Sequence, residues 1–137
     1  MTTKFRWKLA LACSLWLQAH ISAAANWVFT DQQHPIEPPP GVRVIHLDAA
    51  GRIESELAAE LPADPTKAAA IVQQRLADGG ADLQRRLTDA YQGITDAWSL
   101  GVTKIPAVVV DGQYVVYGDP DVSRALATIE TFRRTQP

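Results

Sequence analysis

Residues 105–117 restrict the fold more than any other part of the sequence. Residues 105–110 (IPAVVV) are an apolar, β-branched run that is typical of a buried strand. Asp111-Gly112 follows, and this dipeptide favours a two-residue hairpin turn because both positions tolerate positive φ. Residues 113–117 (QYVVY) then return to strand composition. The segment therefore predicts a β-hairpin close to the C-terminus.

Two further strands are predicted nearer the N-terminus. Residues 26–30 (NWVFT) and residues 42–47 (VRVIHL) are both rich in β-branched and aromatic side chains. The second of these strands is expected to be buried on most of both faces. Between them, residues 31–41 (DQQHPIEPPPG) contain prolines and a glycine that exclude a regular helix, so this segment is predicted to be a loop.

The middle of the chain changes to a helical period. Residues 49–61 carry an apolar residue at every fourth position, and Pro62 ends this short helix. Asp64 then supplies an N-cap, and Pro65 suits the first position of a long helical region. Its predicted inward face consists of Val72, Leu76, Leu83, Leu87, Tyr91, Ile94 and Trp98.

Two glycines interrupt this long helical region. Glycine costs about 1 kcal/mol relative to alanine inside a helix, so Gly79-Gly80 predicts a kink or a break. A final helix begins after Asp119-Pro120, and its predicted inward face consists of Val122, Leu126, Ile129 and either Phe132 or Arg133. The order strand, loop, strand, helices, hairpin, helix is that of an α/β domain whose helices pack on a mixed sheet.

The N-terminus has the pattern of a signal peptide. Lys4, Arg6 and Lys8 precede an apolar run over residues 9–17, and Ala23-Ala24-Ala25 suits cleavage after Ala25. The run is far shorter than the roughly 20 residues that cross a membrane. We therefore expect residues 1–25 to be removed, leaving residues 26–137 as a single periplasmic domain without a stable membrane anchor.

Cleavage at this position removes the sole cysteine, Cys13. A lipid-attachment site is the alternative for Cys13, but no branched apolar residue stands three places before it. Loss of the signal peptide also leaves ten of the 13 basic residues against 15 acidic ones. An acidic chain without a basic stripe is not expected to bind nucleic acid directly.

Residues 101–110 (GVTKIPAVVV) resemble the part of thioredoxin-like proteins where a cis-proline enters the third strand ahead of a hairpin. The resemblance implies a cis peptide bond before Pro106 and a thioredoxin-like mixed sheet with flanking helices. Residues 28–31 (VFTD) are similarly like the first strand of periplasmic disulfide-exchange proteins. Where those proteins have Cys-x-x-Cys and its helix, this chain has residues 32–35 (QQHP) in a proline-rich loop. Thiol exchange needs a thiolate, so the dithiol activity is not expected.

A closer resemblance covers residues 28–130. The stretches VFTDQQHP, LPADP and LADGGADLQRRLTDAYQGITDAWSLGVTKIPAVVVDGQYVVYGDPDV resemble a family of small exported proteins encoded in integrating conjugative elements. Members of this family are associated with the conjugative transfer apparatus and resemble in outline the thioredoxin-like pilus-assembly proteins of type IV secretion systems. The resemblance implies a biological context rather than a biochemical activity.

No residue pattern predicts a catalytic, metal or cofactor site. His34 and His46 lack the further ligands and the spacing of a zinc site. The serines lie outside a G-x-S-x-G elbow, and Asp78-Gly79-Gly80 lacks the lysine of a phosphate loop. We therefore expect no enzyme activity, no metal and no cofactor.

The most promising working surface is the corner that leads into the third strand, where an extended peptide could add to the strand edge. Alternatively, the proline there only shapes the entry into the strand. Hairpin tyrosines, together with Trp27 and Trp98, could extend a partner surface, although core packing explains the tryptophans equally well. The candidate partner-binding residues are Thr103, Lys104, Ile105, Pro106, Tyr114 and Tyr117.

These observations lead us to expect a non-enzymatic periplasmic component of a conjugative transfer system, similar to type IV secretion. It would act by binding other transfer or secretion proteins. Two alternatives remain open on the same scaffold. One is a helper enzyme with residual thiol-disulfide or isomerase activity, and the other is a peptide-binding chaperone for pilus subunits.

Overall fold

The computed structural model describes residues 25–136, which form one four-stranded sheet and three helices. The strand order is β2-β1-β3-β4, where β1 pairs in parallel with β2 and antiparallel with β3, and β3 pairs antiparallel with β4. The strands are β1 (Asn26–Thr30), β2 (Arg43–His46), β3 (Ala107–Val110) and β4 (Tyr114–Tyr117). The predicted signal peptide lies outside the described residues, apart from Ala25.

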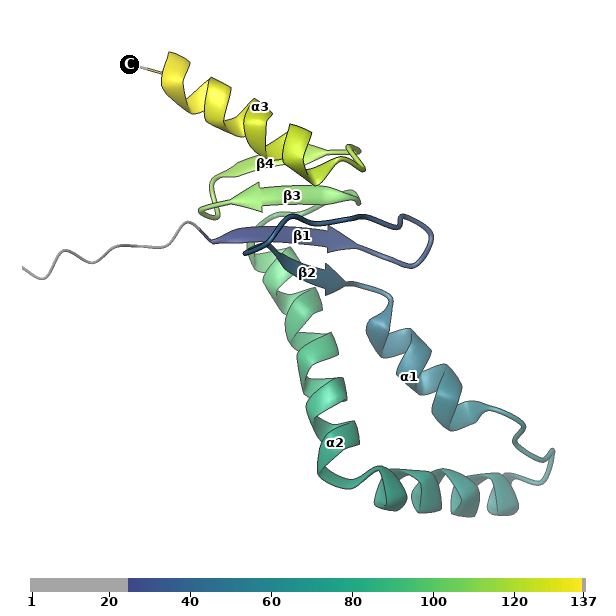
Figure 1. Ribbon diagram of the computed structural model, residues 1–137. Coiled ribbons are helices and arrows are strands. Elements are labelled where there is room, and N and C mark those ends of the chain that lie inside the picture. The colour runs from purple at the N-terminus through teal and green to yellow at the C-terminus, as the bar shows by residue number, and fades with distance from the viewer. Residues whose placement is uncertain (1–24, 137) are drawn as a thin grey trace, which may run out of the picture.

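The helices are α1 (Ala49–Ala58), α2 (Pro65–Ser99) and α3 (Val122–Thr135). Figure 1 shows α3 on one side of the sheet, with α1 and the kinked α2 extending away on the other. This is a mixed α/β arrangement, consistent with the predicted thioredoxin-like fold class, and residues 31–42 form a loop rather than a helix. Among residues 25–136, no helix is long and apolar enough to cross a membrane.

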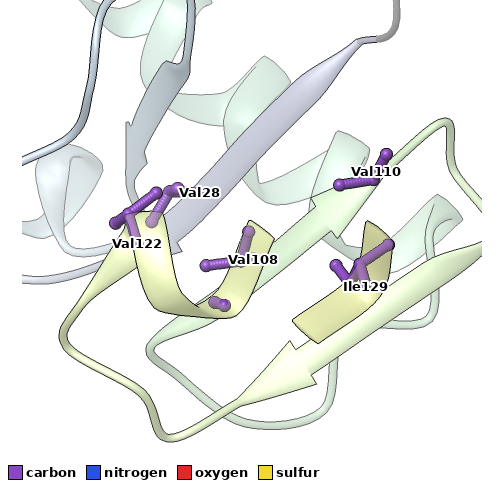
Figure 2. Close-up of a cluster of buried hydrophobic side chains, with 6 residues drawn as sticks. Val28, Val108, Val110, Val122 and Ile129 are labelled. Carbon is purple, nitrogen blue, oxygen red and sulfur yellow. The ribbon is translucent and has the colours of Figure 1, made fainter. Parts of the chain in front are cut away.

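The side of the sheet under α3 holds one apolar cluster. Val28 of β1 and Val108 of β3 are register partners, and both are almost fully buried. Figure 2 shows Val122 and Ile129 of α3 reaching down toward these strands. Because successive strand residues point to opposite faces, the neighbouring Phe29 lies on the other side of the sheet.

The side of the sheet under α2 holds a second cluster, which joins Phe29, Ile45, Ala107 and Val109 to Ala97 of α2. Since both faces are covered, the central strands β1 and β3 read as nearly continuous apolar runs. Strand β2 lies at the edge, and Ile45 is its sole buried residue. The prediction that this strand is buried on most of both faces was wrong, because composition does not show which strand ends the sheet.

The predicted hairpin is present, but its loop is longer by one residue. Asp111 and Gly112 both have positive φ, at 53° and 65°, and the Gln113 amide donates to the Val110 carbonyl at 3.1 Å. Val110 nevertheless pairs with Tyr114, so Gln113 belongs to the loop and not to the returning strand.

The predicted kink in α2 is confirmed. Gly80 has φ 48° and ψ −141°, a conformation outside the helical region that favours glycine.

The predicted start of α2 is confirmed as well, because the Asp64 carboxylate accepts a hydrogen bond from the Lys67 amide at 3.0 Å and Pro65 follows it.

Helix α1 ends at Ala58, earlier than the predicted stop at Pro62. The Arg75 guanidinium donates to the carbonyls of Leu57 and Ala59, both at 2.7 Å. The last carbonyls of a helix have no partner within the helix, so a side chain from α2 satisfies them here. Such a contact across the chain is invisible to local sequence patterns.

The predicted inward face of α2 was partly wrong. Leu83 is buried, but Tyr91, Ile94 and Trp98 are 50%, 40% and 87% exposed. The residues that meet the rest of the protein are instead small: Ala90, Gly93 and Ala97. A Cβ built on Gly93 would lie 2.6 Å from Cγ2 of Ile45, so this glycine lets α2 approach β2 closely.

Candidate functional site

The corner between α2 and β3 is built on a glycine cap. Gly101 has φ 67°, its amide donates to the Trp98 carbonyl at 3.1 Å, and the Val102 amide donates to the Ala97 carbonyl at 2.9 Å. This pair of bonds is the Schellman arrangement, which closes a helix with a glycine in the left-handed region. The chain therefore turns sharply after the last turn of α2, which carries Trp98.

The end of β4 is tied to the same corner. The Tyr117 hydroxyl donates to the Gly101 carbonyl at 3.3 Å and lies 3.4 Å from the Thr103 amide, which donates to it. The Gly118 amide donates to the Pro106 carbonyl at 2.8 Å. The Ile105–Pro106 peptide bond is cis, as the resemblance implied.

The structure brings five of the six candidate residues to this corner. Thr103, Lys104 and Tyr117 are exposed, Ile105 is half-buried against the Phe29 cluster, and Pro106 is buried. Trp98, whose place in core or surface the sequence left open, is also exposed, and its backbone carbonyl accepts the hydrogen bond from the Gly101 amide. We call the exposed set the corner surface: Trp98, Thr103, Lys104 and Tyr117.

Tyr114 does not belong to the corner surface. It lies at the opposite end of β4, beside Val110, and its ring packs edge-on to Phe132 of α3 at 6.2 Å between centroids. The Arg133 guanidinium lies 5.5 Å from the same ring. Trp27 is part-buried, stacked on Phe29 at 6.0 Å with Arg43 at 4.8 Å, so it stabilises the sheet.

The corner surface combines two aromatic rings with one cation. Lys104 takes part in none of the ion pairs found among residues 25–136. Tyrosine and tryptophan combine a large apolar area with a polar tip, and for this reason they dominate protein interfaces. The corner is therefore chemically suited to contact another protein.

A family comparison covers the whole of this architecture. The sequence pattern of the family described as "Protein of unknown function (DUF1525)" matches residues 23–135. The chain belongs to this family. No curated protein and no solved structure matches the chain. The corner surface lies within the DUF1525 domain, as do all four strands and all three helices.

In the DUF1525 domain, the end of β1 is a closed polar turn. The Asp31 carboxylate accepts hydrogen bonds from the amides of Gln33 and His34, both at 2.9 Å, and lies 2.7 Å from Nδ1 of His34. These bonds, led by that from the imidazole, hold the pKa of Asp31 below its ordinary value. The Thr30 hydroxyl donates to the His34 carbonyl at 2.6 Å. The turn comprises residues 32–35, to which the resemblance assigned the place of the Cys-x-x-Cys motif.

A polar hollow of about 520 Å³ lies between β2 and the two helices α1 and α2. Arg43, Arg52 and Arg86 line it, and two of them are already paired. Arg86 donates to Glu56 at 2.8 Å, which raises the pKa of the arginine, and Arg52 lies 3.4 Å from Asp48.

Sequence analysis did not find this hollow, because its basic residues come from three elements with no shared motif. Among residues 25–136 no three or more histidine, cysteine, aspartate or glutamate side chains are placed to hold a metal ion.

Proposed function

We propose that the protein is a non-enzymatic periplasmic component of a conjugative transfer system and that it acts by binding another transfer or secretion protein at the corner surface. In this proposal the domain binds its partner and catalyses no reaction. The corner surface supplies the contact area, and the glycine cap with the Tyr117 hydrogen bonds keeps it in a fixed shape.

The exposure of Trp98 is the observation that carries the proposal. Its ring is 87% exposed at the end of α2, although burial of a large side chain stabilises a fold by about 1.5–3 kcal/mol. At protein interfaces, the residues whose substitution by alanine costs about 2 kcal/mol or more of binding free energy are enriched in tryptophan and tyrosine. An exposed tryptophan at the end of the helix whose cap is bonded to Tyr117 therefore favours a binding surface.

The absence of a usable thiol supports binding over exchange chemistry. Cys13 is the one cysteine in the sequence, and it lies in the predicted signal peptide. At the end of β1, hydrogen bonds to Asp31 and His34 hold the backbone in a tight turn. A thiolate is required to attack a disulfide, so the mature chain would have none to offer.

The export pattern and the resemblance to proteins of integrating conjugative elements support the proposed context. The basic residues, apolar run and alanines of residues 1–25 are those of a cleaved signal peptide. After cleavage, the chain would begin at Asn26, which is the first residue of β1. The domain would thus start at the signal cleavage site without a linker.

Gene deletion with complementation tests this proposal. Donor cells without the gene are expected to transfer the element less often, and the wild-type gene should restore transfer. Trp98→Ala should fail to restore it, although an exposed substitution changes folding stability by no more than about 0.5 kcal/mol. Gln73→Ala, on an exposed position in the first half of α2, is the matched control and should restore transfer.

Two results would count against the proposal. Unchanged transfer after deletion would remove the conjugative role. Full complementation by Trp98→Ala, at a periplasmic protein level equal to that of the wild type, would show that transfer does not depend on the corner surface.

A further inference from the structure

The two edges of the sheet differ in chemistry. Strand β2 carries Arg43 and His46 and borders the arginine-lined hollow, whereas β4 has the sequence YVVY without a charge or a proline. Proteins usually protect an edge strand with charged side chains, prolines or bulges, since its free backbone groups can pair with another chain. Strand β4 is therefore the unprotected edge.

The register shows which backbone groups of β4 are free. The Gly118 amide donates to the Pro106 carbonyl, which makes these two residues a hydrogen-bonded pair. Such pairs alternate along an antiparallel ladder, so Val116 and Tyr114 direct their amides and carbonyls toward β3. Val115 and Tyr117 then direct theirs away from the sheet.

The hydrogen bonds outside the ladders agree with this register. Within residues 25–136, none of them uses the backbone amide or carbonyl of Val115 or Tyr117. Val115 is also 42% exposed and Tyr117 38%. Two amides and two carbonyls are therefore available along this edge.

An apolar groove of about 400 Å³ runs beside the same edge, between β4 and α3. Phe132 is 52% exposed and closes one side of the groove, where its ring meets Tyr114. No charged side chain lines it; the lining residues are Gln113, Tyr114, Val115, Val116, Thr128, Ile129 and Phe132. A segment that added to β4 would place alternate side chains over this groove.

We infer that the β4 edge and the adjoining groove bind an extended, uncharged segment of a partner protein by strand addition. Backbone hydrogen bonds to Val115 and Tyr117 provide the affinity, and apolar side chains at alternate positions fill the groove. A charged segment is disfavoured because the groove offers no opposite charge to a desolvated ion. This inference goes beyond the proposed function, since it needs neither Trp98 nor a conjugative context.

A second copy of the chain fits this edge less well than a free segment. The Tyr114 and Val116 side chains of any copy already pack against the cluster under their own α3. They are therefore not free to fill the groove of a neighbour. A segment without a helix of its own has its side chains available for the groove.

Fluorescence anisotropy with two labelled hexapeptides tests the inference on the purified protein. One probe alternates valine and threonine, and the other has glutamate in place of valine, so that its charges fall at the positions that would fill the groove. The uncharged probe should bind, and the charged probe should bind at least about tenfold more weakly, which corresponds to about 1.4 kcal/mol.

Two substitutions locate the binding. Val115→Pro should weaken it at least about tenfold, because proline removes an outward amide and leaves the bonds to β3 intact. Val115→Thr keeps the amide and is the matched control, with unchanged affinity. Phe132→Ala should also weaken binding. This variant tests the groove independently, even if Val115→Pro fails to fold.

Equal binding of the uncharged probe by wild type, Val115→Pro and Phe132→Ala would overturn the inference. So would a concentration-dependent dimer of the wild type that Val115→Pro abolishes, since the edge would then belong to a second copy. Both outcomes are independent of the transfer assay, in which the tested residue is Trp98.

Discussion

Substitution of Gly93 by alanine tests whether α2 lies on the sheet as closely as the structure places it. The new Cβ would lie 2.6 Å from Cγ2 of Ile45, whereas non-bonded carbon atoms prefer about 3.5–4.0 Å. Helix and strand must therefore separate by roughly 1 Å, and overpacking of this kind costs about 1–3 kcal/mol. The backbone at Gly93 is helical, so the alanine also gains up to about 1 kcal/mol of helix propensity.

Gly51→Ala in α1 is the matched control, because it makes the same chemical change in a helix. Apart from its chain neighbours and the backbone of its own helix, no atom lies within 4 Å of the Cβ position at Gly51. Both variants thus share the gain in helix propensity. The difference between their free energies of unfolding measures the cost of overpacking alone. We expect Gly93→Ala to be less stable than Gly51→Ala by about 1–3 kcal/mol.

Urea unfolding followed by far-ultraviolet circular dichroism measures this difference, with linear extrapolation to water. Equal slopes for the two variants would show that the change lies in stability. Gly93→Ala as stable as Gly51→Ala would refute the close approach of α2 to β2. The placement of the corner surface at the end of α2 would then need revision as well.

Two further predictions concern the helix starts. The Arg124 guanidinium, 2.8 Å from the Asp119 carboxylate, holds the pKa of that carboxyl below its ordinary value of 3.8. The ionised carboxylate therefore stabilises the fold above that value, and this stability is lost as the pH falls through the lowered pKa. Asp119→Asn should reduce the Tm at about pH 7, and the reduction should shrink progressively as the pH falls below the ordinary value. At the start of α2, Asp64→Ala should lower the free energy of unfolding by about 1 kcal/mol because the Lys67 amide loses its acceptor, and Asp64→Asn should restore most of it in the same urea titration.

Local rules predicted the elements that depend on neighbouring residues alone. The apolar run before Asp111-Gly112, the cap at Asp64 and the kink at Gly79-Gly80 all follow from backbone preferences of single residues. The order of these elements was sufficient to predict a mixed α/β arrangement. The loop in place of a helix after β1 followed from its prolines.

The exposure of Trp98 could not be predicted in this way. Helical periodicity shows which residues share a face, but the apolar face of α2 is wider than the area that meets the sheet. The choice between its two sides depends on Gly93 and Ala97, which are small enough to let the helix approach Ile45. Only the packed structure reveals that the large side chains are left outside.

The separation of Tyr114 from Tyr117 was available from the sequence. The two residues are three positions apart in a strand, and side chains alternate with a period of two. They must therefore point to opposite faces of the sheet, as the contacts of Tyr114 with Phe132 and of Tyr117 with Gly101 show. The outward direction of the Val115 backbone amide and carbonyl, by contrast, depends on the pairing of β4 with β3 and on the position of β4 at the edge of the sheet.

Site-specific photo-crosslinking in donor cells tests the central claim most directly. A photoreactive amino acid replaces Trp98 in one strain and the exposed Gln73 in another, and adducts are identified by mass spectrometry. We predict one dominant adduct from position 98, with an exported protein encoded by the same element, and none from position 73. A ladder of many unrelated periplasmic proteins would instead support a chaperone. No adduct from position 98, or the same adducts from both positions, would contradict binding at the corner surface.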